Sequence, residues 1–123
     1  MPTEAEWEYV ARGGLEGKRY LWGDSINSSQ ANYDPNVGKT TTVGSYAANG
    51  YSLYDMAGNV YEWCQDWYGE NYYSGSPAKN PLRPDTGSKR VLRGGSWYYL
   101  TNGLRVASRD YSYPNSRNYN NGF

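Results

Sequence analysis

Ser52 to Asp66 are SLYDMAGNVYEWCQD, the most ordered pattern in a sequence of 123 residues. The run Ala57-Gly58-Asn59 is typical of a turn. The next six residues alternate between two series, one beginning with Val60 and one with Tyr61. Because side chains alternate across a strand with a period of two, this pattern predicts a strand directly after the turn.

Toward the N-terminus, residues 2–14 are PTEAEWEYVARGG and predict a helix from about residue 3 to 12. Thr3 and Glu6 have the spacing of a capping box, in which each side chain bonds the backbone of the other residue. Trp7 and Ala11 are four residues apart and therefore share one helix face. Gly13 follows as a residue that ends helices in the left-handed conformation.

The other segments are shorter or less regular. Residues 40–46 predict a short strand, and residues 67–86, rich in Gly, Pro, Asn and Ser, predict a long loop. Residues 90–97, RVLRGGSW, predict a strand interrupted at Gly94-Gly95 by a bulge or a close approach of backbone. One helix, short strands and long loops together predict a mixed α+β domain.

The composition excludes several classes of function. Lys and Arg number 12, as do Asp and Glu, so the net charge of zero gives no long-range attraction to nucleic acid. No apolar run is long enough for a membrane span. Cys64 is the single cysteine and histidine is absent, which removes the usual Cys-His, Ser-His-Asp and zinc–imidazole sites.

Four motifs, in this order, resemble the formylglycine-generating enzyme (sulfatase-modifying factor) superfamily. The resemblance implies one domain over residues 1–123 with a C-type-lectin-like fold and little regular secondary structure. It also implies that a terminal strand pair is missing, because the chain starts at a motif that normally follows a first strand and helix. The motifs are PTEAEWEYVARGG, YLWGD, VGSYAANGYSLYDMAGNVYEWCQDWY and RVLRGGSW.

The same resemblance argues against catalysis. The oxidising members bind copper with two cysteines shortly after the RVLRGGSW motif, and soft thiolates are suited to copper(I). Here Trp97 is followed by YYLTNGLR, which contains no thiol. Related sulfoxide synthases use histidine-ligated iron, and this chain has no histidine. We therefore expect no enzyme activity and neither copper nor iron.

The C-terminal tail has an unusual composition. Between Tyr98 and Asn121 there is no Lys, Glu, Gln, Met or Trp, although these types supply 19 of the first 97 residues. Seven types found in the tail can be encoded by triplets that differ from AAC only at its adenines, namely Asn, Tyr, Ser, Asp, Gly, Thr and Leu, and the five missing types cannot. This pattern predicts a binding surface whose residues arose by mutation of the adenines in asparagine codons. The alternative is a solvated, turn-rich surface without a special role.

Residues 93–123 also resemble the variable region of a diversity-generating retroelement variable protein. The resemblance implies a fixed frame and a set of replaceable residues, with Thr101 in neither set. We expect the frame arginines after Trp97 to fasten neighbouring loops. The expected frame is Arg93, Gly94, Gly95, Ser96, Trp97, Arg105, Val106, Ala107, Arg109, Pro114, Arg117, Gly122 and Phe123. The expected variable, ligand-binding set is Tyr98, Tyr99, Leu100, Asn102, Gly103, Ser108, Asp110, Tyr111, Ser112, Tyr113, Asn115, Ser116, Asn118, Tyr119, Asn120 and Asn121.

The superfamily resemblance further implies a structural calcium site. Its ligands would be side-chain oxygens of Asp55 and Glu62 and main-chain carbonyls of Gly58 and Val60, which are hard oxygen donors. The alternative is that Asp55 caps the turn that follows it and Glu62 pairs with an arginine such as Arg93.

The leading hypothesis is thus a non-catalytic, hypervariable protein that binds a protein or other macromolecule through its tail. Tyr, Ser, Gly and Asn are also the residues that antibody loops use for recognition. One alternative is a fixed-sequence, non-catalytic accessory binding module of the same superfamily. The other is a formylglycine-generating oxidase.

Overall fold

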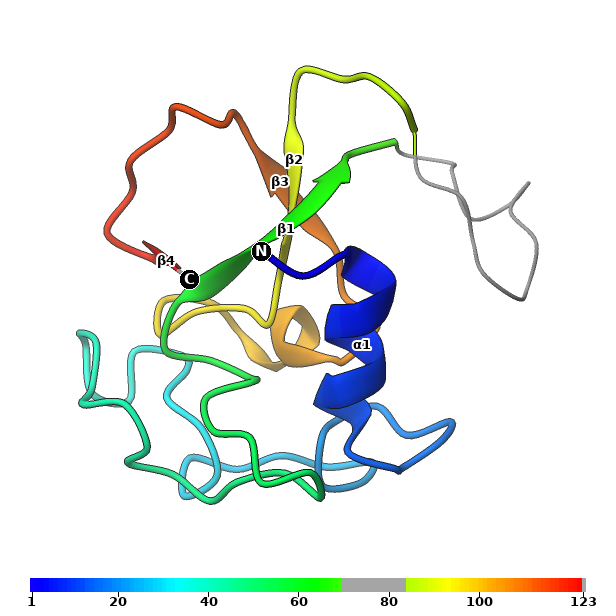
Figure 1. The fold of residues 1–123 in the computed structure, drawn as a ribbon. Coiled ribbons are helices and arrows are strands. Elements are labelled where there is room, and N and C mark those ends of the chain that lie inside the picture. The colour runs from blue at the N-terminus through cyan, green and yellow to red at the C-terminus, as the bar shows by residue number, and fades with distance from the viewer. Residues whose placement is uncertain (70–83, 123) are drawn as a thin grey trace.

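The computed structural model describes residues 1–69 and 84–122 (Figure 1). Most of the predicted loop over residues 67–86, and the frame residue Phe123, lie outside the described residues. None of the helices in the described ranges has the length and apolar character to span a bilayer. The elements in chain order are α1 (Glu4–Arg12), β1 (Tyr61–Trp67), β2 (Arg90–Arg93), the 3-10 helix η2 (Thr101–Leu104), β3 (Asp110–Ser112) and β4 (Asn121–Gly122).

Helix α1 confirms the predicted helix and its caps. The Thr3 hydroxyl accepts from the backbone N–H of Glu6, and the Glu6 carboxylate accepts from the backbone N–H of Thr3. Gly13 ends the helix in the left-handed conformation at φ 56°. These contacts satisfy backbone groups that a helix end would otherwise leave without partners.

The strands form one sheet in the order β3-β2-β1-β4. β1 and β2 pair antiparallel, as do β2 and β3, whereas β4 runs parallel to β1. The strand predicted after the Ala57-Gly58-Asn59 turn is confirmed as β1. β2 confirms the first half of the predicted strand over residues 90–97, and it ends where Gly94 begins.

The strand predicted over residues 40–46 is wrong, because this segment forms no regular element. Two of its backbone donors bond side chains from elsewhere in the chain instead of a neighbouring strand. Thr41 N–H donates to Asn59 Oδ1 at 2.9 Å, and Gly44 N–H donates to Asp55 Oδ2 at 2.7 Å. Side-chain oxygens therefore accept from these backbone N–H groups, which in a sheet would donate to a neighbouring strand.

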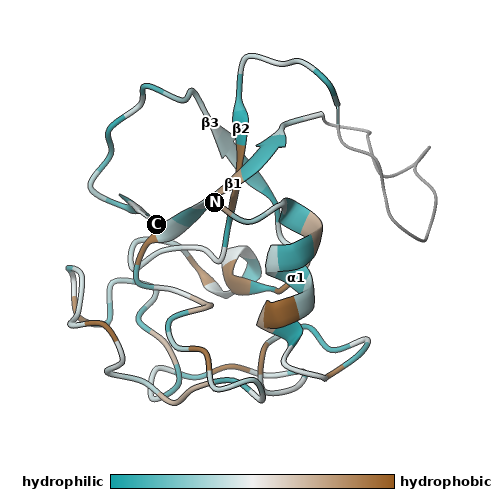
Figure 2. Ribbon diagram, in the orientation of Figure 1, coloured by the Kyte–Doolittle hydropathy of each residue, from teal (hydrophilic) through white to brown (hydrophobic). Residues whose placement is uncertain are grey.

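The core lies between α1 and the sheet. α1 packs against β1 and β2 and buries Trp7 and Ala11 on the predicted face. Cys64 of β1 and Val91 of β2 are fully buried against them, and Leu104 of η2 closes the cluster. In Figure 2 the middle of β2 is hydrophobic where it crosses β1. Large aromatic side chains thus supply core area that the few aliphatic residues do not.

Long loops make up the lower half of the molecule in Figure 1, from the end of α1 to the start of β1. Buried Asn49 fastens them to the helix: its amide nitrogen donates to the carbonyls of Val10 and Ala11 at 2.7 and 3.0 Å. Its amide oxygen accepts from the N–H groups of Tyr51 and Leu53. One helix, one small sheet and loops ordered by such bonds give the expected α+β class.

Candidate functional site

The tail leaves the core through a tight turn directly after β2. Gly94 and Gly95 are buried and have φ values of 94° and 71°, a region that favours glycine. A Cβ atom on Gly95 would lie 2.8 Å from Leu104 Cδ1 and 2.9 Å from the carbonyl oxygen of Gly103. The predicted close approach of backbone is therefore confirmed, and it fixes where Trp97 and the residues after it begin.

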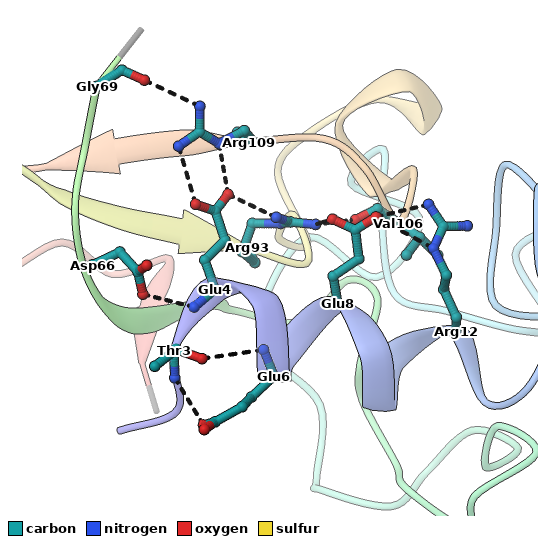
Figure 3. Close-up of polar contacts among 10 residues, drawn as sticks. All are labelled: Thr3, Glu4, Glu6, Glu8, Arg12, Asp66, Gly69, Arg93, Val106 and Arg109. Atoms are coloured by element: carbon teal, nitrogen blue, oxygen red, sulfur yellow. Dashed lines mark hydrogen bonds and ion pairs between the residues drawn. The ribbon is translucent and has the colours of Figure 1, made fainter. Parts of the chain in front are cut away.

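Buried charge joins this part of the chain to α1 (Figure 3). The Arg93 guanidinium is 0% exposed and donates to Glu4 Oε1 and Glu8 Oε2, each at 2.7 Å, and to the Val106 carbonyl at 2.5 Å. Arg109 donates to both carboxylate oxygens of Glu4, at 2.6 and 3.0 Å. Bidentate, charge-assisted bonds of this kind fix the backbone on both sides of η2.

The other two frame arginines of the tail behave differently from the expectation. Arg105 and Arg117 are exposed, and neither side chain bonds any residue within the described ranges. Only Arg109 fastens neighbouring segments, through Glu4 and through the carbonyl of Gly69 at 3.2 Å. The reason is position, since Arg109 directly precedes β3 and faces α1.

Of the 16 predicted variable residues, only Asn120 is buried. The others are exposed or half-exposed. The predicted frame is mixed: Arg93 to Ser96 and Val106 are buried, whereas Arg105, Ala107, Pro114 and Arg117 are exposed. Asn120 is held inside because its carbonyl accepts from the N–H of Tyr61 at 2.7 Å.

Three tyrosines of the predicted variable set form an aromatic platform with Trp97 of the predicted frame. The Tyr98 and Tyr119 rings each lie 5.7 Å from the Trp97 ring, and Tyr99 lies 5.9 Å from Tyr98. Tyr119 is 70% exposed and Tyr98 54%. Large, rigid rings that are already ordered and still open to solvent offer contact area at low entropic cost.

A central cavity of about 90 Å³ lies beside the platform. The residues that line it come from distant parts of the tail. The Tyr61 hydroxyl lies near the Asp110 carboxylate at this cavity. Burial, and then the charge of Asp110, raises the pKa of Tyr61, so the hydroxyl stays a donor. Seven predicted variable residues line the cavity, namely Tyr99, Asp110, Tyr111, Ser112, Asn118, Asn120 and Asn121.

Other predicted residues lie outside this cavity. Ser116 lines an adjoining cavity of about 340 Å³, which Asn118 and Asn121 also border. Tyr113 lies near the ammonium of Lys89, with 5.4 Å between the nitrogen and the ring centre. No contact brings Leu100, Asn102, Gly103, Ser108 or Asn115 to the central cavity.

Residues outside the tail complete the surface, and the composition of the tail could not identify them. Tyr61 and Leu92, on β1 and β2, line the central cavity. Asp34 N–H donates to the Tyr99 carbonyl at 2.9 Å and holds the platform from the loop layer. The alternation of residues 60–65 indicated the strand that contains Tyr61, but only the folded sheet shows what lies next to it.

The four predicted calcium ligands surround the turn before β1. Asp55 Oδ2 accepts from Gly44 N–H and Glu62 Oε2 accepts from the Trp7 indole N–H, each at 2.7 Å. The second oxygen of each carboxylate is therefore available to a cation. Burial, and then the Asp55 charge, raises the pKa of Glu62 to about 7, against the effect of the Trp7 bond. The described residues give no hydrogen bond to the carbonyls of Gly58 and Val60. These donors fit a hard cation such as calcium.

The alternative for these two carboxylates is wrong. Glu62 bonds the indole of Trp7 and forms no ion pair among the residues that the structure describes, while Arg93 pairs with Glu4 and Glu8. Asp55 bonds the distant Gly44 and does not cap the turn that follows it. In the described part of the chain, no group of three or more His, Cys, Asp or Glu side chains gathers as a metal cluster, so carbonyl ligands would be needed.

A family model described as "Sulfatase-modifying factor enzyme 1-like domain" matches residues 1–123. Serine/threonine-protein kinase pkn1 of Chlamydia pneumoniae is 50% identical over 125 residues, which cover all of this chain and 20% of the kinase. Formylglycine-generating enzyme of Streptomyces coelicolor is 45% identical over 141 residues, which cover all of this chain and 45% of the enzyme.

Two solved structures show the same fold. Treponema denticola variable protein 1 matches with a TM-score of 0.84 and 40% identity, over 100% of this chain and 45% of that protein. PvdO from Pseudomonas aeruginosa matches with a TM-score of 0.79 and 32% identity, over 100% of this chain and 50% of that protein. The chain therefore spans half or less of the length of these relatives. The matches confirm both resemblances and the C-type-lectin-like fold.

Proposed function

Because this chain belongs to the sulfatase-modifying factor enzyme 1-like domain family and has the fold of a variable protein, we propose that it is a non-catalytic binding domain. Its tail presents a hypervariable surface to a protein or another macromolecule. The observation that supports this most is the central cavity: seven residues expected to vary line one solvent-facing hollow. A solvated surface without a role has no reason to gather them.

The chemistry of the surface suits recognition. The aromatic platform gives apolar contact area, and the asparagine and serine side chains around the cavity give donors and acceptors in several directions. The frame below is rigid, because the Arg93 and Arg109 bonds to Glu4 hold it from one side and the close packing of Gly95 from the other. Such preorganisation lowers the entropic cost of binding.

A selection experiment tests this proposal. One display library varies the predicted variable residues with codons that differ from AAC at the adenines, and a second varies exposed residues of the loop layer, such as Tyr51, Tyr54 and Val43. Both are selected against the same panel of purified proteins. We expect the tail library to give binders to several targets and the loop library to give few. Equal yields would contradict a dedicated binding surface.

Hypervariability makes a separate prediction about the gene. Codons for the variable residues should end in C or T, and a near-copy of the segment and a reverse transcriptase gene should lie close by. Mixed third letters that include A and G would favour a fixed-sequence accessory module instead. One finding supports that second candidate: the 125-residue match occupies only 20% of the pkn1 kinase, so a closely related domain occurs within a larger protein.

The absence of catalysis is also part of the proposal. Cys64 is fully buried in the core, and burial raises the pKa of its thiol to about 12, so it is not an available thiolate. No cysteine follows Trp97 and no histidine occurs in the sequence. An assay of copper-dependent thiol oxidation should give no turnover. Turnover that depends on this chain would favour the oxidase hypothesis.

We further propose that Asp55, Glu62 and the carbonyls of Gly58 and Val60 hold a structural calcium ion. Bound calcium would neutralise two carboxylates that no cation of the described residues pairs with. Calcium should raise the melting temperature of the protein, and Glu62→Gln should remove the rise while Glu16→Gln, in an exposed loop, retains it. A calcium effect of equal size in Glu62→Gln would contradict this site.

A further inference from the structure

The central cavity has one charged group and lacks a partner for it. Asp110 is the only acidic residue after Trp97. Its carboxylate accepts from the N–H of Tyr111 at 2.7 Å and lies near the Tyr61 hydroxyl. Within residues 1–69 and 84–122 it forms no ion pair. A carboxylate has about four acceptor sites, so Asp110 retains capacity for a further donor.

The cations near Asp110 are engaged elsewhere. Arg109 bonds Glu4 on the side of the sheet that faces α1. The Arg90 guanidinium stacks on Trp67, with 3.6 Å to the ring centre, and Lys89 lies 4.3 Å from the ring centre of Tyr111, beside a different cavity. Arg117 lines the adjoining cavity and makes no ion pair with Asp110. The negative charge of the central cavity is therefore available to a ligand.

Other groups around the cavity match a flat, multidentate cation. Asn118 donates its amide nitrogen to Ser116 Oγ at 3.3 Å, which leaves its amide oxygen as an acceptor. Tyr99, which is half-exposed, also lines the cavity. A guanidinium group has five donors in one plane and stacks on aromatic rings, whereas an ammonium has three donors and no plane.

The size of the cavity also fits. A single buried water needs roughly 10–15 Å³, so about 90 Å³ has room for a group of several heavy atoms. We propose that the central cavity binds the side chain of an arginine presented by a protein partner, with Asp110 as its counter-ion. This inference rests on the proposed binding function and specifies the chemistry that this copy of the surface selects.

The test uses acetyl-argininamide as the probe and acetyl-citrullinamide as its neutral analogue of the same shape. Amide signals of Tyr111 and Asn120 are followed by NMR during titration of the intact protein. We expect saturable shifts with a roughly millimolar dissociation constant for the arginine probe. The citrulline probe should bind the wild type about tenfold or more weakly than the arginine probe does. The arginine probe should bind Asp110→Asn about tenfold or more weakly than it binds the wild type. Glu16→Gln removes the same charge from an exposed loop and should change nothing.

Two outcomes would overturn the inference: no shift with the arginine probe, or equal shifts with the citrulline probe or in Asp110→Asn. If that variant fails to fold, the wild type still gives the answer, because added salt must weaken the arginine shifts but not shifts caused by a neutral contact. The selection with tail libraries is independent of the probe. If the tail library yields binders while the arginine probe gives no shift in the wild type, the proposed function stands and only the assignment of the cavity fails.

Discussion

Glu62 is an acidic side chain in a largely buried site, and this makes the stability of the protein depend on pH. Its pKa is raised to about 7 from 4.5. When a chelator keeps metal ions away, the folded state therefore holds this proton more tightly than the unfolded state does. The resulting stabilisation is complete below pH 4.5 and is lost as pH rises through 7, by up to about 3 kcal/mol. Glu8 acts below this window, because its pKa is lowered.

Urea unfolding at several pH values, with chelator present, measures this dependence. The free energy of unfolding should fall between pH 4.5 and 7 in the wild type and in the control Glu16→Gln. In Glu62→Gln, whose amide can still accept from Trp7, the fall should be largely absent. A wild-type curve that is flat over this range would show that Glu62 titrates normally.

Arg93 is the residue whose loss should damage the fold most. Arg93→Met would remove both bonds to Glu4 and Glu8 and leave buried carboxylate charge with fewer partners, although Arg109 still bonds Glu4. We expect a loss of about 3 kcal/mol in the free energy of unfolding. The control Arg105→Met, at an exposed arginine, should change it by less than about 0.5 kcal/mol. Similar values for both variants would mean that the buried charges contribute little.

At the scale of elements, the turn after β2 joins the core to the binding surface. Gly95 and Gly17 have nearly the same φ, 71° and 69°, but a Cβ atom would meet Gly103 and Leu104 at Gly95 and open space at Gly17. Gly17→Ala should therefore cost only about 1 kcal/mol for the left-handed backbone. Gly95→Ala should cost about 1–3 kcal/mol more, because the packed turn must shift.

Thermal unfolding of the two variants gives this difference directly. NMR shifts of the Tyr98 and Tyr99 amides should also move in Gly95→Ala and stay in place in Gly17→Ala. Equal melting temperatures would show that the backbone near Gly95 has room to adjust.

The elements also show which features the sequence could predict. α1 was predictable because its determinants are local: the Thr3–Glu6 capping box, the face shared by Trp7 and Ala11, and Gly13. The segment over residues 40–46 was not, because the side chains of Asn59 and Asp55 that bond its backbone are distant in sequence. Local alternation of residue types resembles a strand whether or not a neighbouring strand is available.

For the candidate site, the sequence could predict which residues of the tail reach solvent but not how they are arranged. Composition and codon logic identified the tail, and nearly all of the residues expected to vary do reach solvent. The central cavity forms because β4 pairs parallel with β1 and β3 pairs with β2, which brings both ends of the tail to Tyr61 and Leu92. Pairing between strands that are distant in sequence could not be predicted from this one sequence.

Across the whole molecule, we propose that a buried framework must be kept while an exposed surface can be replaced. The buried bonds of Arg93, the turn at Gly94-Gly95 and the core around Trp7 determine the fold. In the proposed function, the aromatic platform and the central cavity determine what is bound. Because exposed substitutions away from such features usually change stability little, many tail sequences should be compatible with one fold.

Protease resistance of displayed variants tests this separation most directly. One library replaces the exposed variable residues, such as Tyr98, Tyr113, Asn118 and Tyr119, by other residues that AAC-derived codons allow. A second library makes an equal number of replacements among Arg93, Gly94, Gly95, Ser96 and Val106. We expect most variants of the first library to stay resistant and few of the second to do so. Equal resistant fractions in the two libraries would contradict this separation.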